Sequence, residues 1–410
     1  MNRVGAAVAL VAAWAALAAC SSSSLGGAAS PPITLEARRP SASDSIGKAY
    51  RFLNLMMDRY AEGSTRRLVQ SFDGGPLKNF TDAVTYDDAL LVDAMLTRGT
   101  TEDISRSKIV GDAFLYVQNY DTAHDGRLRA AYAPKPLKKP SDVIVDDNTS
   151  DVGNMAWVGQ ALVQLYAKTA DAQYLNGAIA IAQWLQANTY DTRGRGGYTG
   201  GYTARGKKIE WKSTEHNIDI YAFFTMLAKE SRERRWATGA AWARRFTSSM
   251  WDPAAGRFYV GTLDDGVTPN KPFKPEDVNS WSYLAFANPR WSAAPSWDVT
   301  HLGVSKDGFN GVSFCSGDRS GVWFEGTAHL ADALELRGRA GDRTRARQYI
   351  GDVHYAQTNG PNSDGLGIIA ASENGLSDCD GDKYFAALHV GATAWYVMAA
   401  VGSNPFALLR

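Results

Sequence analysis

The sequence carries no excess of either charge, no apolar run long enough to span a membrane and no cluster of histidines. The chain has 410 residues, and its 43 basic side chains balance its 43 acidic ones. A surface that binds nucleic acid needs an excess of Lys and Arg, so this balance argues against such a partner. No two of the 6 His stand at metal-ligand spacing with a third ligand nearby, so we expect no metal site.

The N-terminus has the pattern of an export signal. Arg3 precedes an apolar run over 4–19 that is too short and too rich in Ala for a membrane span. The run ends in LAAC at Cys20, which resembles the lipobox of bacterial lipoproteins, where the Cys becomes the lipidated first residue. We therefore expect a signal peptide over 1–19, a lipid anchor on Cys20 and a flexible Ser/Gly/Pro tether over 20–44. An ordinary cleaved secretory signal is the alternative.

The remaining cysteines agree with export. Ser21 is not the Asp that retains lipoproteins at the inner membrane of enteric bacteria, so the resemblance implies an outer-membrane anchor that faces the periplasm or the cell surface. With Cys20 lipidated, Cys315 and Cys379 remain, and two thiols in an oxidising compartment predict one disulfide. Two free thiols in a reducing compartment are the alternative, which conflicts with the export signal.

Six segments repeat one design, a polar or acidic opening followed by a helix that is apolar nearly all round. They begin at residues 85, 150, 213, 276, 321 and 389, so the spacings are 65, 63, 63, 45 and 68 residues. Between them lie amphipathic helices with one charged face, which begin at 45, 102, 172, 233 and 342. A sixth amphipathic helix, expected after Ala287, is poorly marked and is predicted to be short.

Recurrence at about 60 residues is typical of a closed or stacked array of repeats. Residues 45–410 are therefore predicted to form one all-α domain, an (α/α)6 toroid of six helical hairpins. The stretches GGYTGGYTARGKKIEW and GRFYVGTLDDG are predicted to form short β-hairpins or loops at its rim.

In such a toroid all six inner helices start at the same end, so their polar openings would converge on one bowl. A polar pocket lined by aromatic rings at the end of a helical barrel is typical of a ligand site. Capping accounts for one or two acids at helix starts but does not require six of six. The polar residues of this bowl are Asp87, Asp88, Asp151, Asn154, Glu215, His216, Asp219, Asp277, Asn279, Glu325 and His389, and its expected lining is Tyr86, Trp157, Trp211, Trp281 and Trp323.

The chain resembles the six-hairpin glycosidase superfamily over nearly all of residues 45–410. The resemblance rests on the number of hairpins and on the motifs TYDDALL, DVGNMAWVGQAL, WKSTEHNID, WFEGTA and HVGATAW. It implies a saccharide held in the bowl and acidic residues that cut a glycosidic bond. Several families with this fold perform other chemistry, so the fold does not fix the reaction.

Glycoside hydrolysis needs one protonated carboxyl group as acid and one ionised carboxylate as base or nucleophile. Glu215 lies between Trp211 and the aromatic run IYAFF, whose apolar walls would raise its pKa, so it is the candidate acid. Asp151, Asp87 and Glu325 compete for the second role. Each of the four could instead be a capping residue.

The other bowl residues are predicted to bind the sugar. His216 and His389 are expected to hydrogen-bond hydroxyl groups, and no cofactor is expected. The run Asp378, Asp380, Asp382 resembles the opening of an EF-hand, but Lys383 stands where Gly is needed and His389 where the bidentate Glu belongs. The predicted substrate-binding residues are Tyr86, Asp88, Asn154, Trp157, Trp211, His216, Asp219, Trp281, Trp323 and His389.

Three hypotheses follow. The first is a monomeric glycoside hydrolase that acts on a bacterial or plant polysaccharide or oligosaccharide. The second is a polysaccharide lyase or sugar epimerase on the same toroid, although a lyase would need Arg or Lys to neutralise a uronate, and the bowl has little Arg beyond Arg193, Arg195 and Arg205 on a rim loop. The third is a lipoprotein that binds glycans without catalysis. A product absorbing at about 232 nm would identify the lyase, and reducing ends without it the hydrolase.

Overall fold

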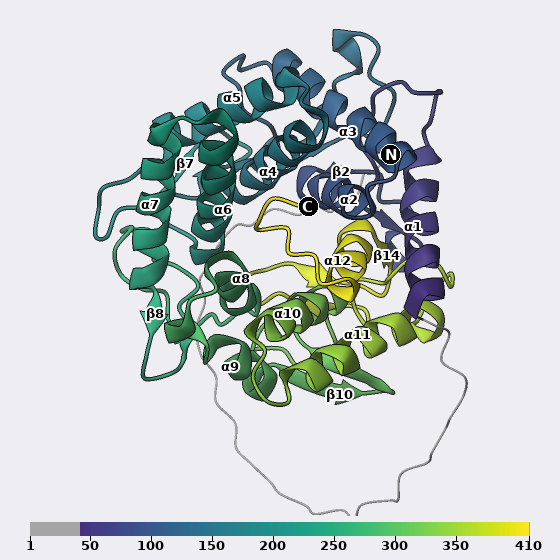
Figure 1. Ribbon diagram of the computed structural model, residues 1–410, viewed down its shortest axis with the longest axis vertical. Coiled ribbons are helices and arrows are strands. Elements are labelled where there is room, and N and C mark those ends of the chain that lie inside the picture. The colour runs from purple at the N-terminus through teal and green to yellow at the C-terminus, as the bar shows by residue number, and fades with distance from the viewer. Residues whose placement is uncertain (1–41, 410) are drawn as a thin grey trace, which may run out of the picture.

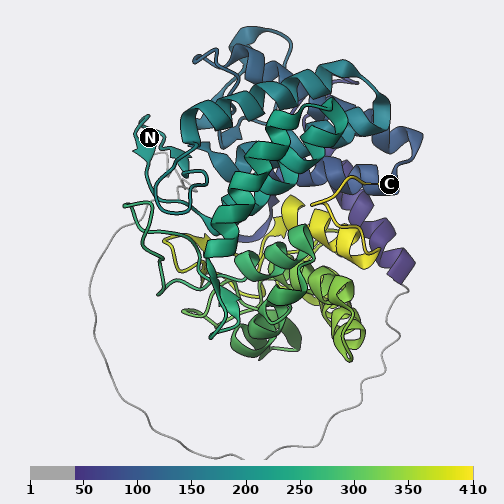
Figure 2. The ribbon, with the colours of Figure 1, turned by 60° about the vertical axis from the view of Figure 1, so that its left-hand side comes forward.

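A computed structural model describes residues 42–409 of the chain as a helical toroid (Figures 1 and 2). The predicted signal peptide, Cys20 and nearly all of the tether lie outside the described residues. The inner helices are α2 (Thr85–Arg98), α4 (Val152–Thr169), α6 (Thr214–Ser231), α8 (Asp277–Phe286), α10 (Phe324–Arg337) and α12 (Val390–Ala400). The outer helices are α1 (Ala42–Asp58), α3 (Thr101–Tyr120), α5 (Ala172–Thr189), α7 (Arg234–Ser249), α9 (Ala294–His301) and α11 (Asp342–Asn359).

The inner helices close into a ring. Each packs against the next, from α2 to α4, α6, α8, α10 and α12, and α12 packs back against α2. Figure 1 shows the outer helices around this ring, with α1 beside α12. The predicted (α/α)6 toroid is thereby confirmed. The poorly marked outer helix is indeed short, since α9 has 8 residues and follows the 3-10 turn Pro289–Trp291.

Each inner helix from α2 to α10 ends in the same way. The residue that follows it adopts the left-handed conformation, which stops the helix and lets the chain reverse into the outer helix within a few residues. The five residues are Gly99, Ala170, Arg232, Ala287 and Gly338. Two of them are Gly, the residue type that adopts this conformation without steric cost.

The connections at the other end are long and carry short antiparallel strands. The predicted rim hairpins correspond to the sheet β5-β6-β7 and the pair β8-β9. The strands are β1 (Phe72–Asp73), β2 (Ala83–Val84), β3 (Ala131–Tyr132), β4 (Val145–Asp147), β5 (Ser150–Asp151), β6 (Gly201–Tyr202), β7 (Lys208–Ile209), β8 (Trp251–Asp252), β9 (Arg257–Phe258), β10 (Gly303–Lys306), β11 (Phe309–Val312), β12 (Leu376–Ser377), β13 (Lys383–Tyr384) and β14 (Leu388–His389). Two further 3-10 turns are Gly75–Leu77 and Pro140–Asp142.

The segment after α12 closes the end of the ring where the inner helices finish. In Figure 1 this yellow segment crosses the middle of the toroid. Phe406 packs edge-on against Trp157 at 5.1 Å between ring centroids and also contacts Trp281 and Trp395. Gln164, near the end of α4, donates to the Ala407 carbonyl at 2.8 Å. These contacts fill the end of the ring where the inner helices finish.

A disulfide joins two of the long connections. Cys315, before α10, is bonded to Cys379, before α12, with their Cα atoms 6.3 Å apart. These are the two cysteines expected to pair. Because both connections lie at the open end of the ring, the bond holds two walls of that end together.

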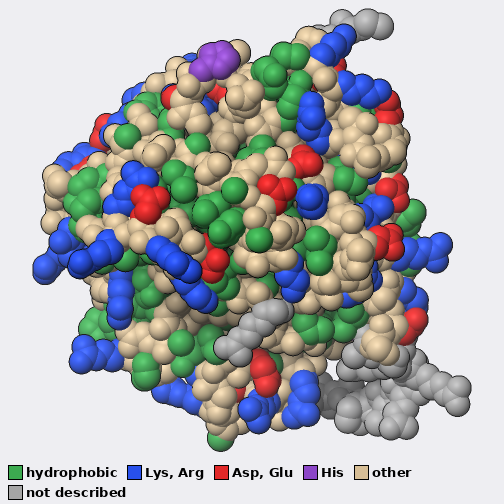
Figure 3. Space-filling model, turned by 45° about the horizontal axis from the view of Figure 1, so that its top comes forward, with side chains coloured by type: hydrophobic (Ala, Val, Ile, Leu, Met, Phe, Trp, Pro, Cys, Tyr) green, Lys and Arg blue, Asp and Glu red, His purple; other side chains and the backbone are tan. Residues whose placement is uncertain are grey.

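The surface carries charges of both signs. The face drawn in Figure 3 shows Lys and Arg side chains interspersed with Asp and Glu and with small apolar patches. Within residues 42–409, no helix has the length and apolar character needed to cross a bilayer.

The Phe406 plug provides a test of the closed end. Phe406 is 5% exposed and fills the space between three Trp rings, so Phe406→Ala should lower the free energy of unfolding by about 3–5 kcal/mol. Guanidinium denaturation followed by Trp fluorescence measures this. Leu263→Ala, in an exposed loop, is the control and should change stability by less than about 0.5 kcal/mol. Equal midpoints for the two variants would show that the plug does not contribute.

Candidate active site

The openings of the inner helices converge at the open end of the ring, in the bowl expected from the sequence. All four carboxyl groups predicted to act in catalysis are there. Asp87, Glu215 and Glu325 lie in the first turns of α2, α6 and α10, and Asp151 is the N-cap of α4. Asp87 and Glu325 are buried, whereas Asp151 and Glu215 are partly exposed.

Glu325 is surrounded by donors and positive charge. The Tyr86 hydroxyl donates to its Oε1 at 2.6 Å, and Trp395 in turn donates to the Tyr86 hydroxyl at 3.0 Å. His329 Nε2 lies 3.7 Å from Oε1, and His389 Nδ1 lies 3.4 Å from Oε2. Burial alone would raise the pKa of Glu325, but these partners outweigh it and lower the pKa below its usual value. Glu325 is therefore ionised at neutral pH.

Neighbouring carboxyl groups raise the pKa of both histidines. Burial disfavours a charged imidazole, but Glu276 and Glu325 more than offset this for His329 and raise its pKa to about 9. His329 Nδ1 lies 3.2 Å from Glu276 Oε2, and both side chains are completely buried. His389 Nε2 lies 3.1 Å from Asp87 Oδ1, and the pKa of His389 is likewise raised despite its burial.

Glu215 has the opposite character. Its surroundings are low in water, and the negative groups Asp277, Asp219, Asp151 and Glu325 add to the effect, so its pKa is raised well above the usual value. Desolvation and Glu276 similarly raise the pKa of Asp277 to about 7. From the sequence, apolar walls were expected to raise the pKa of Glu215. Burial is indeed the largest cause, and the neighbouring carboxyl groups, which were not foreseen, come second.

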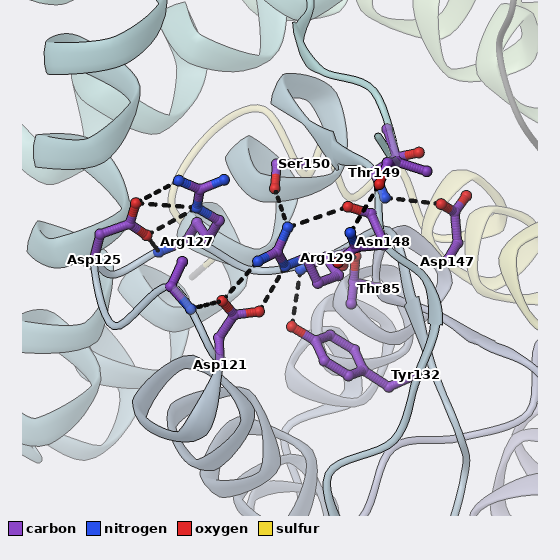
Figure 4. Close-up of polar contacts among 12 residues, drawn as sticks. Thr85, Asp121, Asp125, Arg127, Arg129, Tyr132, Asp147, Asn148, Thr149 and Ser150 are labelled. Atoms are coloured by element: carbon purple, nitrogen blue, oxygen red, sulfur yellow. Dashed lines mark hydrogen bonds and ion pairs between the residues drawn. The ribbon is translucent and has the colours of Figure 1, made fainter. Parts of the chain in front are cut away.

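A buried ion pair contacts Ser150, the residue before Asp151 (Figure 4). Arg129 donates to both oxygens of Asp121, from Nε at 2.6 Å and from Nη2 at 2.8 Å, and reaches the hydroxyl of Ser150 at 3.3 Å. The Asp151 carboxylate accepts from the amide of Asn154 at 2.9 Å. Asp151 therefore caps α4 and still has its second oxygen 3.5 Å from His216 Nε2.

His216 and Trp211 form one side of the bowl. Their rings lie 5.8 Å apart, and Trp211 is partly exposed. Gly153 gives His216 its room, because a Cβ at this position would stand 2.8 Å from the imidazole Cδ2. Asn154, on the first turn of α4, is also partly exposed.

The other predicted binding residues lie deeper. Trp157 and Trp281 are 1% and 3% exposed and pack against each other at 5.4 Å, so they form the floor above Phe406. Asp88 is fully buried and accepts from the amide of Val69 at 2.9 Å. Asp219 is also fully buried, and burial and Asp151 raise its pKa well above normal. The contact of these four side chains with a sugar stays a prediction.

Trp323 forms a wall. It is 3% exposed, and its ring occupies the space that the missing side chain of Gly326 leaves, where a Cβ would come within 2.1 Å of the indole. Gly326 thus makes room for the Trp323 ring.

Sequence reasoning missed His329, Glu276 and Tyr384. His329 follows Glu325 by four residues, the spacing that places two side chains on one helix face, and this signal could have identified it. Glu276 precedes α8 in the segment that was recognised, beside Asp277. Tyr384 lies in a strand of a long connection, and no local pattern marks it.

The carboxylate of Asp378 binds backbone amides of its own loop. Asp378 Oδ1 accepts from the amides of Asp380, Gly381 and Asp382 at 2.8, 3.0 and 2.9 Å. Within residues 42–409, no group of three or more His, Cys, Asp or Glu side chains has an arrangement that could hold a metal ion.

The sequence matches no protein-family model and no curated protein. Solved structures share the toroid, however. D-mannose isomerase superimposes with a TM-score of 0.66 and 11% identity over 90% of this chain and 98% of its own. Cellobiose 2-epimerase from Bacillus thermoamylovorans B4167 gives 0.64 and 10% identity over 87% and 99% of the two chains. A family 76 glycoside hydrolase from a bovine Bacteroides thetaiotaomicron strain gives 0.60 and 12% over 87% and 78%.

At these identities the likeness establishes the fold. The neighbours are six-hairpin glycosidase-like proteins, and they include an isomerase, an epimerase and a hydrolase, so the fold alone does not choose the reaction. The choice has to come from the side chains in the bowl.

The buried His329 gives a pH test of the site. Its pKa is about 9 in the folded protein and about 6.5 when unfolded, so its contribution to stability is complete below pH 6.5 and is lost as the pH rises through 9. The wild-type melting temperature should fall over this interval, and the fall should be shallower in His329→Gln. His301→Gln, at an exposed histidine on α9, is the control and should keep the wild-type slope. Identical slopes in all three proteins would contradict a charged His329.

Proposed function

We propose that the protein is a glycoside hydrolase that cleaves a polysaccharide or oligosaccharide with Glu215 and Glu325. The observation that carries the proposal is the opposite effect of the bowl on these two carboxyl groups. Glu215 has a raised pKa and Glu325 a lowered one, although both open inner helices of the same ring. Two carboxyl groups whose environments push their pKa values apart are the requirement for acid and base roles in glycoside cleavage.

Glu215 would be the acid. It is partly exposed at the open end of the ring, so it can reach a substrate, and its raised pKa favours the protonated form that the glycosidic oxygen needs. Its raised pKa would also keep it protonated toward alkaline pH. The alkaline limb of the rate profile would therefore reflect Glu215.

Glu325 would be the ionised partner. His329 and His389 keep it charged, and Tyr86 fixes the direction of its Oε1. Its carboxylate either attacks the anomeric carbon, which retains configuration, or activates a water, which inverts it. Asp87 would act through His389 as a positioning residue, and Asp151 would orient His216 toward the sugar.

A neutral sugar or an amino sugar suits this bowl. The ionised Glu325 would repel a uronate, and the basic side chains Arg193 and Arg205 stand on the rim connection rather than among the carboxyl groups. The substrate class is therefore proposed to be an uncharged or amino-sugar glycan.

A sugar isomerase or epimerase is the second candidate, because two of the structural neighbours carry such names. These reactions remove a proton from carbon and need an unprotonated base. The pKa of about 9 disfavours His329 as that base, and the pKa of His389 is also raised. Reducing-sugar release without a change of free monosaccharide would separate the two reactions.

Glu215→Gln tests the acid. Gln has nearly the same size but no proton to transfer, so the rate of reducing-end release should fall by about 10²–10⁴. The melting temperature should stay the same or rise, because Gln also removes a carboxyl group whose ionisation is disfavoured in the folded state. Glu210→Gln, at an exposed position of the rim, is the control and should retain full turnover. Normal turnover with a lower melting temperature in Glu215→Gln would assign Glu215 to capping.

We further propose that the enzyme is an outer-membrane lipoprotein in the cell envelope and a monomer. The support is the LAAC sequence that ends at Cys20, followed by Ser21 and a Ser/Gly/Pro tether. Multiple acyl chains would make such attachment stable.

Cys20→Ser tests the anchor. The described fold begins at Ala42, 22 positions after Cys20, so the variant should be folded and should appear in the soluble fraction, whereas the wild type should sediment with membranes. Ser21→Ala is the matched control and should sediment like the wild type. If Cys20→Ser remains in the membrane fraction after a high-salt wash, the lipoprotein hypothesis is wrong.

A further inference from the structure

Four aromatic side chains form a continuous strip from the rim to the carboxyl groups. Its members, hereafter the aromatic strip, are Phe273, Phe314, Tyr384 and Trp323. Phe314 lies 6.5 Å from Phe273 and 5.6 Å from Tyr384 between ring centroids, with interplanar angles of 23° and 34°. Tyr384 lies 5.5 Å from Trp323. The first three rings are partly exposed and Trp323 is buried.

The inner end of the aromatic strip touches the catalytic groups. The Trp323 ring lies 5.2 Å from the ring of His329, which contacts Glu325. The Phe314 carbonyl accepts from the amide of Glu276 at 2.8 Å, next to Asp277. Burial raises the pKa of the Tyr384 phenol, and the nearby carboxyl groups of Glu325, Asp277 and Glu215 raise it further. The strip is therefore continuous with the candidate active site.

The connections that carry the strip are fixed before any ligand arrives. The Cys315–Cys379 disulfide joins the connection of Phe314 to that of Tyr384. Ser377, paired with Lys383 in the β12–β13 hairpin, donates its amide to Asp318 at 2.9 Å across the same two connections. A ligand that stacks here would not have to order these loops, which reduces the entropic cost of binding.

Flat apolar rings at the mouth of a polar pocket are suited to the apolar faces of pyranose rings. We propose that the aromatic strip is a subsite that stacks a neutral hexopyranose ring of an oligosaccharide chain, next to the bond presented to Glu215 and Glu325. The carboxyl groups at its inner end disfavour an anionic sugar there. The inference deepens the proposed hydrolase function and rests on it for the position of the cleaved bond, but binding at the strip can be measured without turnover.

Phe314 is the ring to change, because it stands between Phe273 and Tyr384 and its side chain takes no part in the backbone bond to Glu276. The probes are the hexasaccharides of β-1,4-glucose, α-1,6-mannose, β-1,4-N-acetylglucosamine and α-1,4-galacturonate, and the four monosaccharides. Binding is measured by titration calorimetry on the full-length chain carrying Glu215→Gln, so that no probe is consumed.

At least one neutral hexasaccharide should bind more tightly than its monosaccharide. Phe314→Ala should weaken that binding about tenfold, or about 1.4 kcal/mol, and Phe314→Tyr, which keeps the ring, should restore it. Tyr355→Ala is the control, because Tyr355 is 41% exposed on the outer helix α11, and it should bind like the parent. Far-UV circular dichroism and the melting temperature verify that each variant is folded.

Three results would overturn the subsite. They are binding that Phe314→Ala leaves unchanged, weakening that Phe314→Tyr fails to restore, and binding of none of the neutral hexasaccharides. The proposed function fails separately. If Phe314→Ala weakens binding as expected but the wild type releases no reducing ends from the bound hexasaccharide, the subsite stands and the hydrolase assignment falls.

Discussion

The closure of six inner helices into one ring is the constraint on which the rest of the structure depends. Because inner and outer helices alternate, every inner helix begins at the same end, and the segment around Phe406 closes the other. The polar openings therefore face one another in a confined space with little water. In such a space neighbouring carboxyl groups cannot all be ionised, since each charge raises the cost of the next.

The protein resolves this crowding by placing its cations unevenly. His329 and His389 both lie close to Glu325, and a further carboxyl group raises the pKa of each, Glu276 for the first and Asp87 for the second. Glu215 receives no comparable partner and faces mainly acids. The pKa of one carboxyl group is thus lowered and that of another raised within the same bowl. This asymmetry, rather than the number of acids, is what gives the site the potential for acid–base chemistry.

The sequence predicted the features that depend on periodicity. The spacing of the apolar helices indicated six hairpins and a common end for their polar starts, and the structure has both. It could not predict which acids would be ionised, because that depends on contacts such as the one between Glu325 and His389, which are 64 positions apart in the chain. The sequence also could not show which aromatic residues of the bowl lie deep in the ring and which lie at its rim. Trp157 and Trp211 both follow polar openings, but only the structure shows the first packed on Phe406 and the second at the rim.

The two ends of the hairpins differ in a way that separates chemistry from recognition. At the closed end most of the reversals are short, for instance the two residues between Thr169 and Ala172. At the open end long connections such as the one between α11 and α12 carry strands, the disulfide and Tyr384. The candidate acid and its ionised partner lie on the rigid helices, whereas the aromatic strip is built mostly from the connections. A change in the sequence of a connection could therefore alter which sugar is held while the electrostatic difference between Glu215 and Glu325 stays intact. This independence of the connections from the helices offers a physical reason why one toroid can support several reactions on sugars.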